Sequence, residues 1–399
     1  MSGRSPGDQL TARLRTVWPD PIPISLSRAP RRHAGESEEY LVLPTRSRPV
    51  FLIPADSPGA AGALVRSDDG QRAPVLARAL GAAHRRGLLG RAPGVTRVGV
   101  PGTEGLVAIV RRLVPEADAV VVRLGRRRHG RAVVIQPLDT EGRTLAFAKC
   151  ARGAGAGAGR LAAERDRLHE LADRPVQGIT PPLVLGWAVE DDAAVLCLGA
   201  LTPSAPPISN GVPLTAMHAL ATRTGSGPEL PLAETPLVRR LSDEAAALAA
   251  ATPDAEWIVD HLRRLVETHG TVPVTTASWH GDWVPWNMVR DGDDVLLWDW
   301  EHHEDDVLSG FDHVHYLAQT RRLRDGTDTA AEAAWLVDAR HALESDWGLS
   351  PEQSEVTIAA YLIAVNLRFV AERVDDPAGP TNRQGWGRPL VERLAGAGS

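Results

Sequence analysis

The chain has 399 residues, of which 43% are hydrophobic and 24% charged, a composition that excludes a wholly disordered protein and leaves room for two or three domains. Its formal net charge of −6 argues against a general nucleic-acid binder. The apolar runs are far shorter than the roughly 18 residues that span a bilayer, and the N-terminus lacks the apolar stretch of a signal peptide, so no membrane or export segment is expected. Two cysteines, Cys150 and Cys197, cannot build a disulfide framework, which favours a cytoplasmic location.

Residues 1–112 are predicted to form an α/β extension of unknown role. The predicted elements are the strands Glu39–Pro44 and Pro49–Pro54, joined as a hairpin, the helices Pro58–Arg66 and Ala73–Leu88, the strand Val95–Val100 and the helix Leu106–Leu113. No residue pattern in this part carries recognisable chemistry. It is interpreted either as a docking domain or as additional packing on the domain that follows.

Residues 113–201 are predicted to form a small β-rich lobe. Its predicted elements are the strands Ala119–Leu124, Arg131–Leu138, Thr144–Cys150 and Ala193–Leu198, and an amphipathic helix that carries Leu161, Glu164, Leu168 and Leu171. The bridge Gly153–Gly159 alternates Gly and Ala and is expected to be mobile. The Pro-rich stretch Thr202–Pro207 marks the end of this lobe.

Residues 202–399 are predicted to be mainly helical, with one β-type insertion at Thr276–Trp300. The predicted helices are Leu214–Arg223, Pro236–Ala251, Glu256–Thr268, Thr329–Trp347 and Val356–Val374.

The β-type insertion contains a cluster of residues with catalytic spacing. His280, Asp282 and Asn287 follow the protein-kinase catalytic-loop pattern H-x-D-x-x-x-x-N, in which a carboxylate orients an acceptor hydroxyl and an amide oxygen turns back to bind Mg²⁺. Asp299 ends an apolar run where a second carboxylate would face the same ion. A simple turn or helix cap explains His280–Asp282 alone, but not the combination with Asn287 and Asp299.

One basic residue differs from all the others. The 44 basic residues comprise 43 arginines and a single lysine, Lys149. Because Lys is a compact point charge and Arg a planar fork, a single retained Lys indicates a position where Arg would not serve. The alternative is a chance remainder in an arginine-rich sequence.

The segment from about residue 118 to 376 resembles the aminoglycoside phosphotransferase family, relatives of protein kinases in the choline-kinase-like group. His280, Asp282 and Asn287 match the catalytic-loop motif of that family, and Asp299 matches the metal-binding Asp of its D-x-E motif. The resemblance implies that Asp282 is the catalytic base, that Asn287 and Asp299 are Mg²⁺ ligands, and that His280 supports the loop.

The resemblance also assigns roles outside the catalytic loop. Asp312, in a Gly-Phe-Asp piece, would brace that loop. Lys149 and Glu164 lie where the family has a strand Lys for the ATP phosphates and a helix Glu that holds it, which weakens the chance explanation of the single Lys. The glycine-rich phosphate loop is absent. Gly125 and Gly130 enclose a basic turn instead, which either approaches the phosphates or is solvated surface.

The fold implied by the resemblance is α+β: a bilobal protein-kinase-like fold with a small β-rich N-lobe (residues 113–201, nucleotide side) and a large helical C-lobe (residues 202–399, acceptor side), preceded by the extension. The implied function is an ATP- or GTP- and Mg²⁺-dependent phosphotransferase that acts on a hydroxyl of a small molecule such as an aminoglycoside, a sugar or an amino alcohol. A non-catalytic kinase-like scaffold, a kinase of a peptide substrate and a metal-dependent phosphoester hydrolase are the alternatives. The sequence leaves the acceptor, the choice of ATP or GTP and the oligomeric state open.

Three further expectations concern residues around the motif. Several side chains have the types of metal ligands, but a solvated loop and helix surface explains them better than a zinc site: His302, His303, Glu304, Asp305, Asp306, His313 and His315. The acidic members and Glu301 would favour a cationic acceptor. Most of the nearby tryptophans are expected to be core, whereas Trp283 or Trp286 is a candidate for stacking on a substrate ring.

Overall fold

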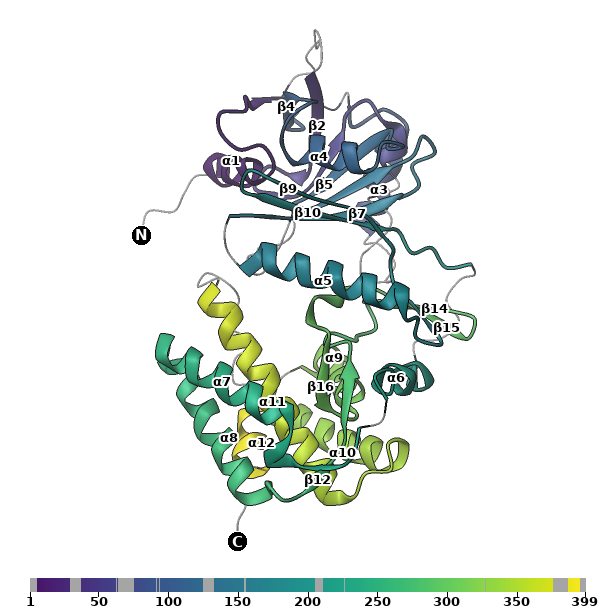
Figure 1. Cartoon of the computed structure of the whole chain (residues 1–399). Helices are drawn as coiled ribbons and strands as arrows, with labels where there is room; N and C mark the ends of the chain where they lie inside the picture. The colour runs from purple at the N-terminus through teal and green to yellow at the C-terminus, as the bar shows by residue number, and fades with distance from the viewer. Residues whose placement is uncertain are drawn as a thin grey trace. The chain divides into compact units, whose positions relative to one another are not determined.

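The computed structural model describes residues 6–28, 37–61, 63, 75–90, 92, 94–124, 133–153, 156–204, 211–225, 227–326, 328–375 and 387–394. The chain divides into two compact units, which are described separately (Figure 1). The first unit comprises Met1–Ala172 and Pro182–Thr202, and the second comprises Asp173–Pro181 and Pro203–Ser399. Both helices and strands are abundant, so the expected α+β class is confirmed.

The first unit is built on a nine-stranded sheet in which all neighbouring strands are antiparallel. In spatial order the strands are β1 (Ser25–Ser27), β4 (Arg97–Pro101), β2 (Ser37–Thr45), β3 (Arg48–Pro54), β5 (Ala119–Arg123), β6 (Val133–Leu138), β7 (Ala146–Arg152), β10 (Ala193–Gly199) and β9 (Val184–Glu190). The predicted hairpin is present as β2 and β3.

The sheet runs without a break from the extension into the following lobe. Phe51 and Leu52 of β3 pair with Arg123 and Val122 of β5. Four strands from residues 1–112 therefore belong to the same sheet as the strand that carries Lys149. These four strands therefore pack on the neighbouring lobe within one sheet.

Helices cover both faces of this sheet because its strands alternate apolar residues between them. On β5, Val120 and Val122 pack with α1 (Pro6–Val17) and α4 (Gly105–Leu113). Val121, between them, packs on the opposite side with the short helix η1 (Pro58–Ala61) and with α3 (Val75–Arg85). Helix α1 was not expected, although its buried Leu10, Leu14 and Val17 follow a helical spacing.

Helix α5 (Ala156–Asp173) begins inside the bridge that was expected to be mobile. That expectation is wrong for residues 156–159, which form the first turn of the helix; residues 154 and 155 lie outside the described residues. Alanine favours helix, and two consecutive side chains attach α5 to the sheet. Glu164 pairs with Lys149 on β7, and the guanidinium of Arg165 lies 4.8 Å from the ring centre of Trp187 on β9.

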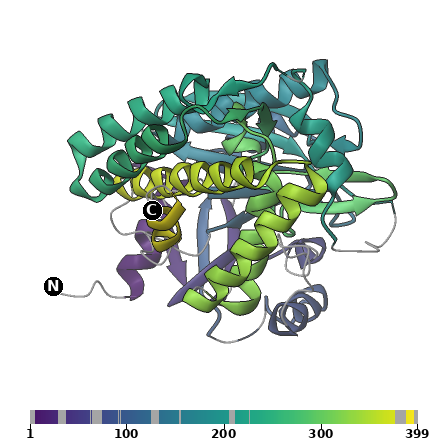
Figure 2. The ribbon, with the colours of Figure 1, turned by 90° about the horizontal axis from the view of Figure 1, so that it is seen from below.

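The second unit is mainly helical, and its core lies among the long helices. These are α6 (Leu214–Ala221), α7 (Pro236–Ala251), α8 (Glu256–His269), α9 (Phe311–Asp325), α10 (Thr329–Asp346), α11 (Pro351–Asp375) and α12 (Arg388–Leu394), with the short helices η2 (Leu232–Glu234), η3 (Pro253–Ala255) and η4 (Trp300–His302). Figure 2 shows α11 beside the pair formed by α7 and α8, which it contacts. Among the described helices, α11 alone is long and apolar enough to cross a membrane, but 78% of its apolar window is buried within the protein, as in a core helix.

Short strands in the second unit hold the predicted catalytic residues. They are β8 (Ile179–Thr180), β11 (Leu230–Pro231), β12 (Pro273–Val274), β13 (Thr276–Trp279), β14 (Met288–Asp291), β15 (Asp294–Leu297) and β16 (Glu304–Leu308). Strands β14 and β15 form a hairpin that β8 extends, and β13 pairs with β16. The predicted β-type insertion is thus two small sheets joined by the loop that follows Trp279.

Candidate active site

The loop that carries the motif is anchored by the carboxylate of Asp312. The backbone N–H of His280 donates to Oδ2 of Asp312 at 2.7 Å, and the N–H of Gly281 donates to Oδ1 at 3.2 Å. Asp312 is buried in the first turn of α9. Burial raises the pKa of Asp312 to about 7, against the effect of the two backbone donors. These contacts are those of a residue that braces the loop.

Gly281 gives the loop its sharp bend. Its φ is +83°, a left-handed conformation that side chains rarely adopt, and a Cβ at this position would collide with the carbonyl oxygen of His302. The carbonyl oxygen of Gly281 accepts a hydrogen bond of 2.8 Å from Nη1 of Arg368 on α11. The bend is therefore fixed from two directions.

His280 lies fully buried beneath the loop in its neutral form. Its Nδ1 accepts the backbone N–H of Asp282 at 3.2 Å, so the ring proton is on Nε2. The ring packs edge-on against Trp300, with centres 4.6 Å apart. Burial lowers the pKa of His280 to about 3, although the nearby carboxylates of Asp282 and Asp299 act in the opposite direction. A histidine held in this way supports the loop and does not titrate near neutral pH.

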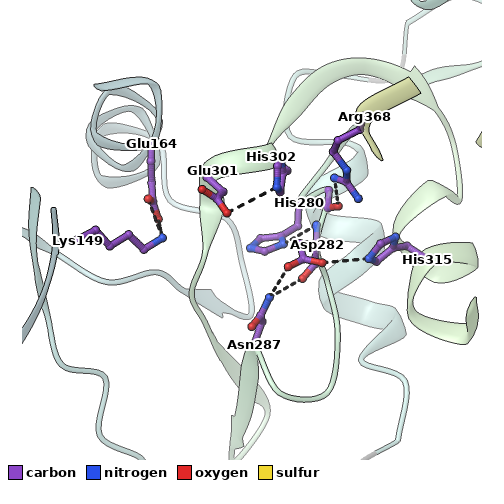
Figure 3. Close-up of polar contacts among 10 residues, drawn as sticks. Lys149, Glu164, His280, Asp282, Asn287, Glu301, His302, His315 and Arg368 are labelled. Atoms are coloured by element: carbon purple, nitrogen blue, oxygen red, sulfur yellow. Dashed lines mark hydrogen bonds and ion pairs between the residues drawn. The ribbon is translucent and has the colours of Figure 1, made fainter. Parts of the chain in front are cut away.

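Both carboxylate oxygens of Asp282 are engaged (Figure 3). Nδ2 of Asn287 donates to Oδ2 at 2.9 Å and to the backbone oxygen of Asp282 at 3.0 Å, while Nε2 of His315 lies 3.2 Å from Oδ1. The side chain keeps 22% of its surface exposed. Burial alone would raise the pKa of Asp282, but the hydrogen bond from His315 and the charge of Arg368 hold it well below its usual range. The group is a carboxylate at neutral pH and can accept a hydrogen bond from a hydroxyl.

Asn287 and Asp299 lie at the same end of the β14–β15 hairpin. Met288 pairs with Leu297, and the N–H of Trp298 donates to the carbonyl oxygen of Asn287 at 3.1 Å, which continues the pairing to the residue before Asp299. Asp299 has φ +75° and ψ +55°, a costly backbone conformation for a non-glycine residue. Such strain is typical of residues whose side chain must point in one direction for function.

This pair of side chains fits a magnesium ion by its chemistry. The nitrogen of Asn287 is used by Asp282, which leaves the amide oxygen for a ligand, and Asp299 adds a carboxylate. Mg²⁺ takes one or two protein oxygens and completes its octahedron with water and substrate phosphates. Among the residues that the structure describes, no group of three or more His, Cys, Asp or Glu side chains is arranged to hold a metal ion.

In the first unit, Lys149 and Glu164 form a close ion pair. Nζ of Lys149 lies 2.7 Å and 2.8 Å from the two carboxylate oxygens of Glu164. Glu164 is fully buried, and the Lys149 side chain is 18% exposed. The pair joins α5, which carries Glu164, to β7, which carries Lys149. Gly125 and Gly130, the predicted phosphate-loop glycines, lie outside the described residues.

The structure corrects two expectations about side chains near the motif. Trp283 is fully buried and its Nε1 donates to the sulfur of Met288 at 3.3 Å, so its expected stacking on a substrate is wrong; Trp286 is half-buried and stays a candidate. His303, His313 and His315 are buried and therefore do not belong to a solvated surface.

Two of the four acidic residues near the motif, Glu304 and Asp305, lie beside arginines. Glu304 is bound by Arg240 at 2.8 Å, and Asp305 accepts from Ser278 at 2.7 Å and lies 3.5 Å from Arg223. These contacts reduce the negative field on which the expectation of a cationic acceptor depends.

Two residues that contact the loop, and a third that contacts one of these two, were not predicted as part of a site. His315 contacts Asp282, Tyr361 contacts His315, and Arg368 contacts Gly281. His315 had been noticed as a possible metal ligand only. Tyr361 stands alone among the apolar residues of α11, whereas His315 lies in a polar stretch of α9, and nothing local relates either residue to Asp282.

Comparisons with known proteins give structural similarity only, since no protein-family model and no curated protein matches the sequence. A thermostable variant of aminoglycoside phosphotransferase APH(4)-Ia, in complex with ADP and hygromycin B, matches 73% of this chain and 98% of its own at 13% identity and a TM-score of 0.48. Choline kinase LicA from Streptococcus pneumoniae matches 72% of this chain and 96% of its own at 15% identity and a TM-score of 0.43. APH(3'')-Id from Streptomyces rimosus, in complex with ADP and streptomycin, matches 58% of this chain and 89% of its own at 18% identity and a TM-score of 0.37. The chain thus has structural matches among aminoglycoside phosphotransferases and choline kinases, the group that its motifs resemble, and the TM-scores below 0.5 leave the function to be argued from the site itself.

Proposed function

We propose that the protein transfers the γ-phosphoryl group of ATP or GTP, with Mg²⁺, to a hydroxyl of a small molecule. The observation that carries the proposal is the contact between Asn287 and Asp282. One amide nitrogen holds the catalytic carboxylate, and the oxygen of the same amide is left for a metal. A carboxylate for the acceptor and a hard oxygen ligand for the metal are thereby fixed relative to each other, as phosphoryl transfer requires.

Asp282 would act on the acceptor. An ionised carboxylate accepts a hydrogen bond from the acceptor hydroxyl and orients its oxygen toward the phosphorus. A low pKa makes Asp282 a weak base, which suits a loose transition state in which the hydroxyl proton leaves late. The hydroxyl would pass its proton to Asp282 as the new O–P bond forms, while the bond between the γ-phosphorus and the bridging oxygen breaks and the electron pair leaves with ADP or GDP.

Lys149, Asn287 and Asp299 would act on the nucleotide. Lys149 is held by Glu164, and its side chain keeps 18% of its surface exposed. The amide oxygen of Asn287 and the carboxylate of Asp299 would hold Mg²⁺, which when bound supplies positive charge to the phosphates. The intact Lys149–Glu164 pair supports catalysis over a scaffold without activity, because a scaffold has no need to retain it.

The test is phosphoryl transfer to a mixed library of aminoglycosides, amino alcohols and sugars. Wild-type protein with MgATP or MgGTP should give at least one product whose mass increases by one phosphoryl group. Asp282→Asn should lower that rate by roughly two to four orders of magnitude, because the proton acceptor is lost. Asp293→Asn, at an exposed position of the β14–β15 turn, is the matched control and should keep the rate. A wild-type protein without turnover of either nucleotide would support the scaffold instead.

A further inference from the structure

The carboxylate of Asp282 is held by two residues, one inside the sequence motif and one outside it. Asn287 lies within the loop and engages Oδ2 of Asp282, whereas His315 comes from α9 and engages Oδ1. Tyr361, from α11, contacts the other nitrogen of the same His315 ring. We propose that His315, oriented by Tyr361, is a positioning residue for Asp282, an inference that rests on the proposed phosphotransfer.

The directions of the two hydrogen bonds that link Tyr361, His315 and Asp282 follow from the chemistry of these groups. A carboxylate is ordinarily ionised at neutral pH and has no proton to give, so Nε2 of His315 is the donor across the 3.2 Å separation to Oδ1 of Asp282. Neutral histidine then accepts at Nδ1, and the hydroxyl of Tyr361 donates to it at 3.0 Å. Burial lowers the pKa of His315, in agreement with the neutral ring. Tyr361 therefore selects the tautomer that points an N–H at Asp282.

The surroundings of His315 and Tyr361 are largely aromatic, with the charges of Arg322 and Arg368 nearby. His315 and Tyr361 are both fully buried, and the rings around them are those of Trp279, Phe311 and Trp335. Placing a histidine and a phenol hydroxyl there is costly unless each finds a partner, and an apolar side chain would fill the same space without that cost. The described polar contacts lead to one exposed group, the carboxylate of Asp282. The arrangement serves that carboxylate better than it serves packing.

Holding both oxygens fixes the rotation of the carboxylate about its Cβ–Cγ bond. With Asn287 on Oδ2 and His315 on Oδ1 (Figure 3), the carboxylate cannot turn, and the remaining lone pair of each oxygen keeps a fixed direction for the acceptor hydroxyl. The neutral donor stabilises the negative charge without adding a positive charge beside the hydroxyl. Loss of His315 should therefore reduce the rate of the transfer step and leave the binding of nucleotide unchanged.

Two amide substitutions separate this role from packing. The amide nitrogen of glutamine can reach the place of Nε2 of His315, and that of asparagine reaches only the place of Nδ1. His315→Asn should lower kcat by about 10- to 100-fold, the range expected for one hydrogen bond to a charged group, with the KM for MgATP unchanged. His315→Gln should have a kcat within about threefold of the wild-type value. The kcat of Tyr361→Phe should lie between those of His315→Asn and His315→Gln.

The matched control is His313, which lies on the same helix and is also buried. Its ring accepts a hydrogen bond from Nε1 of Trp347, and it has no described contact with Asp282. His313→Asn and His313→Gln should change the melting temperature without changing kcat. Rates are measured with the acceptor found in the library or, for a common reference, with water as acceptor for MgATP. Equal kcat in His315→Asn and His315→Gln, in an active wild-type background, would overturn the positioning role alone. A wild type that transfers to no acceptor and does not hydrolyse MgATP would overturn the proposed function and this inference together.

Discussion

Asn287 has two chemically different ends, and the site uses both. Its nitrogen donates to the carboxylate and the backbone oxygen of Asp282, so its oxygen is the atom that remains for a metal. An aspartate at this position would lose both hydrogen bonds and place a second negative charge against Asp282. The residue type is thus explained by the contacts at each end of the amide.

Among the individual site residues, the sequence predicts those that lie within one loop. His280, Asp282 and Asn287 are close in sequence, so their spacing alone brings them together. His315 contacts Asp282 from 33 positions away, and Arg368 contacts Gly281 from 87 positions away. No local spacing relates such residues, because the packing of α9 and α11 decides where they meet.

Lys149 is the residue for which the sequence and the structure give the sharpest prediction. Lys149→Arg keeps the charge and can still pair with Glu164, but the wide guanidinium cannot replace a compact ammonium at a phosphate. Its affinity for MgATP, measured by calorimetry, should fall by about tenfold or more, the equivalent of one charge-assisted contact. Circular dichroism should show an unchanged fold.

Arg152 offers the matched control for this substitution. It lies on the same strand and pairs with Asp192 at the surface, so Arg152→Lys should bind nucleotide as the wild type does. Wild-type affinity in Lys149→Arg would mean that Lys149 does not contact the phosphates.

Among the elements, α9 shows why part of the fold was not predicted. Its buried side includes Asp312, His313 and His315, which occupy positions where a helix pattern expects apolar residues. The apolar periodicity is therefore hidden, although α7 and α8, whose buried sides are mostly apolar, were predicted almost to the residue. The helix that supports the site is the one whose sequence departs from the ordinary pattern.

The bend after β13 gives a prediction about the loop as an element. Gly281→Ala must adopt a left-handed backbone, at a cost of about 1–2 kcal/mol, and in addition its Cβ would meet the carbonyl of His302. Gly292→Ala, in the β14–β15 turn, has a similar φ of +67° but nothing within 4 Å of the added Cβ. Urea unfolding should show a larger loss of stability for Gly281→Ala, and only this variant should lose activity. Equal losses would mean that the close approach to His302 does not constrain the loop.

Over the whole chain, the strand pairing of the nine-stranded sheet is the feature that could not be predicted from local sequence. Each strand was recognisable from its own β-type run, apart from β1 and the exposed edge strand β9. The pairing of β3 with β5 joins segments separated by α4 and the elements before it, and such a long-range pairing leaves no local pattern. The extension was therefore recognised as α/β but not as part of the sheet.

Removal of residues 1–112 tests this continuity. The truncated chain would lose four strands, the helices α1 and α3, the short helix η1 and nearly all of α4, and would expose the apolar residues of β5 along a free edge. We expect residues 113–399 to be insoluble, or to lack a cooperative unfolding transition for the first unit in thermal denaturation. A soluble fragment that unfolds cooperatively and binds nucleotide would show that the extension is a separate domain.

The most direct test of the proposed phosphotransfer compares Asp282→Asn with Asp299→Asn. Calorimetry gives the affinity for MgATP at two Mg²⁺ concentrations, and a product assay gives the rate of transfer. Asp282→Asn should retain the affinity and lose the rate, because Asp282 is assigned to the acceptor. Asp299→Asn should lose both, most clearly at the lower Mg²⁺ concentration, because a charge facing the metal is removed. Loss of nucleotide binding in Asp282→Asn with retention in Asp299→Asn would contradict the assignment of both residues.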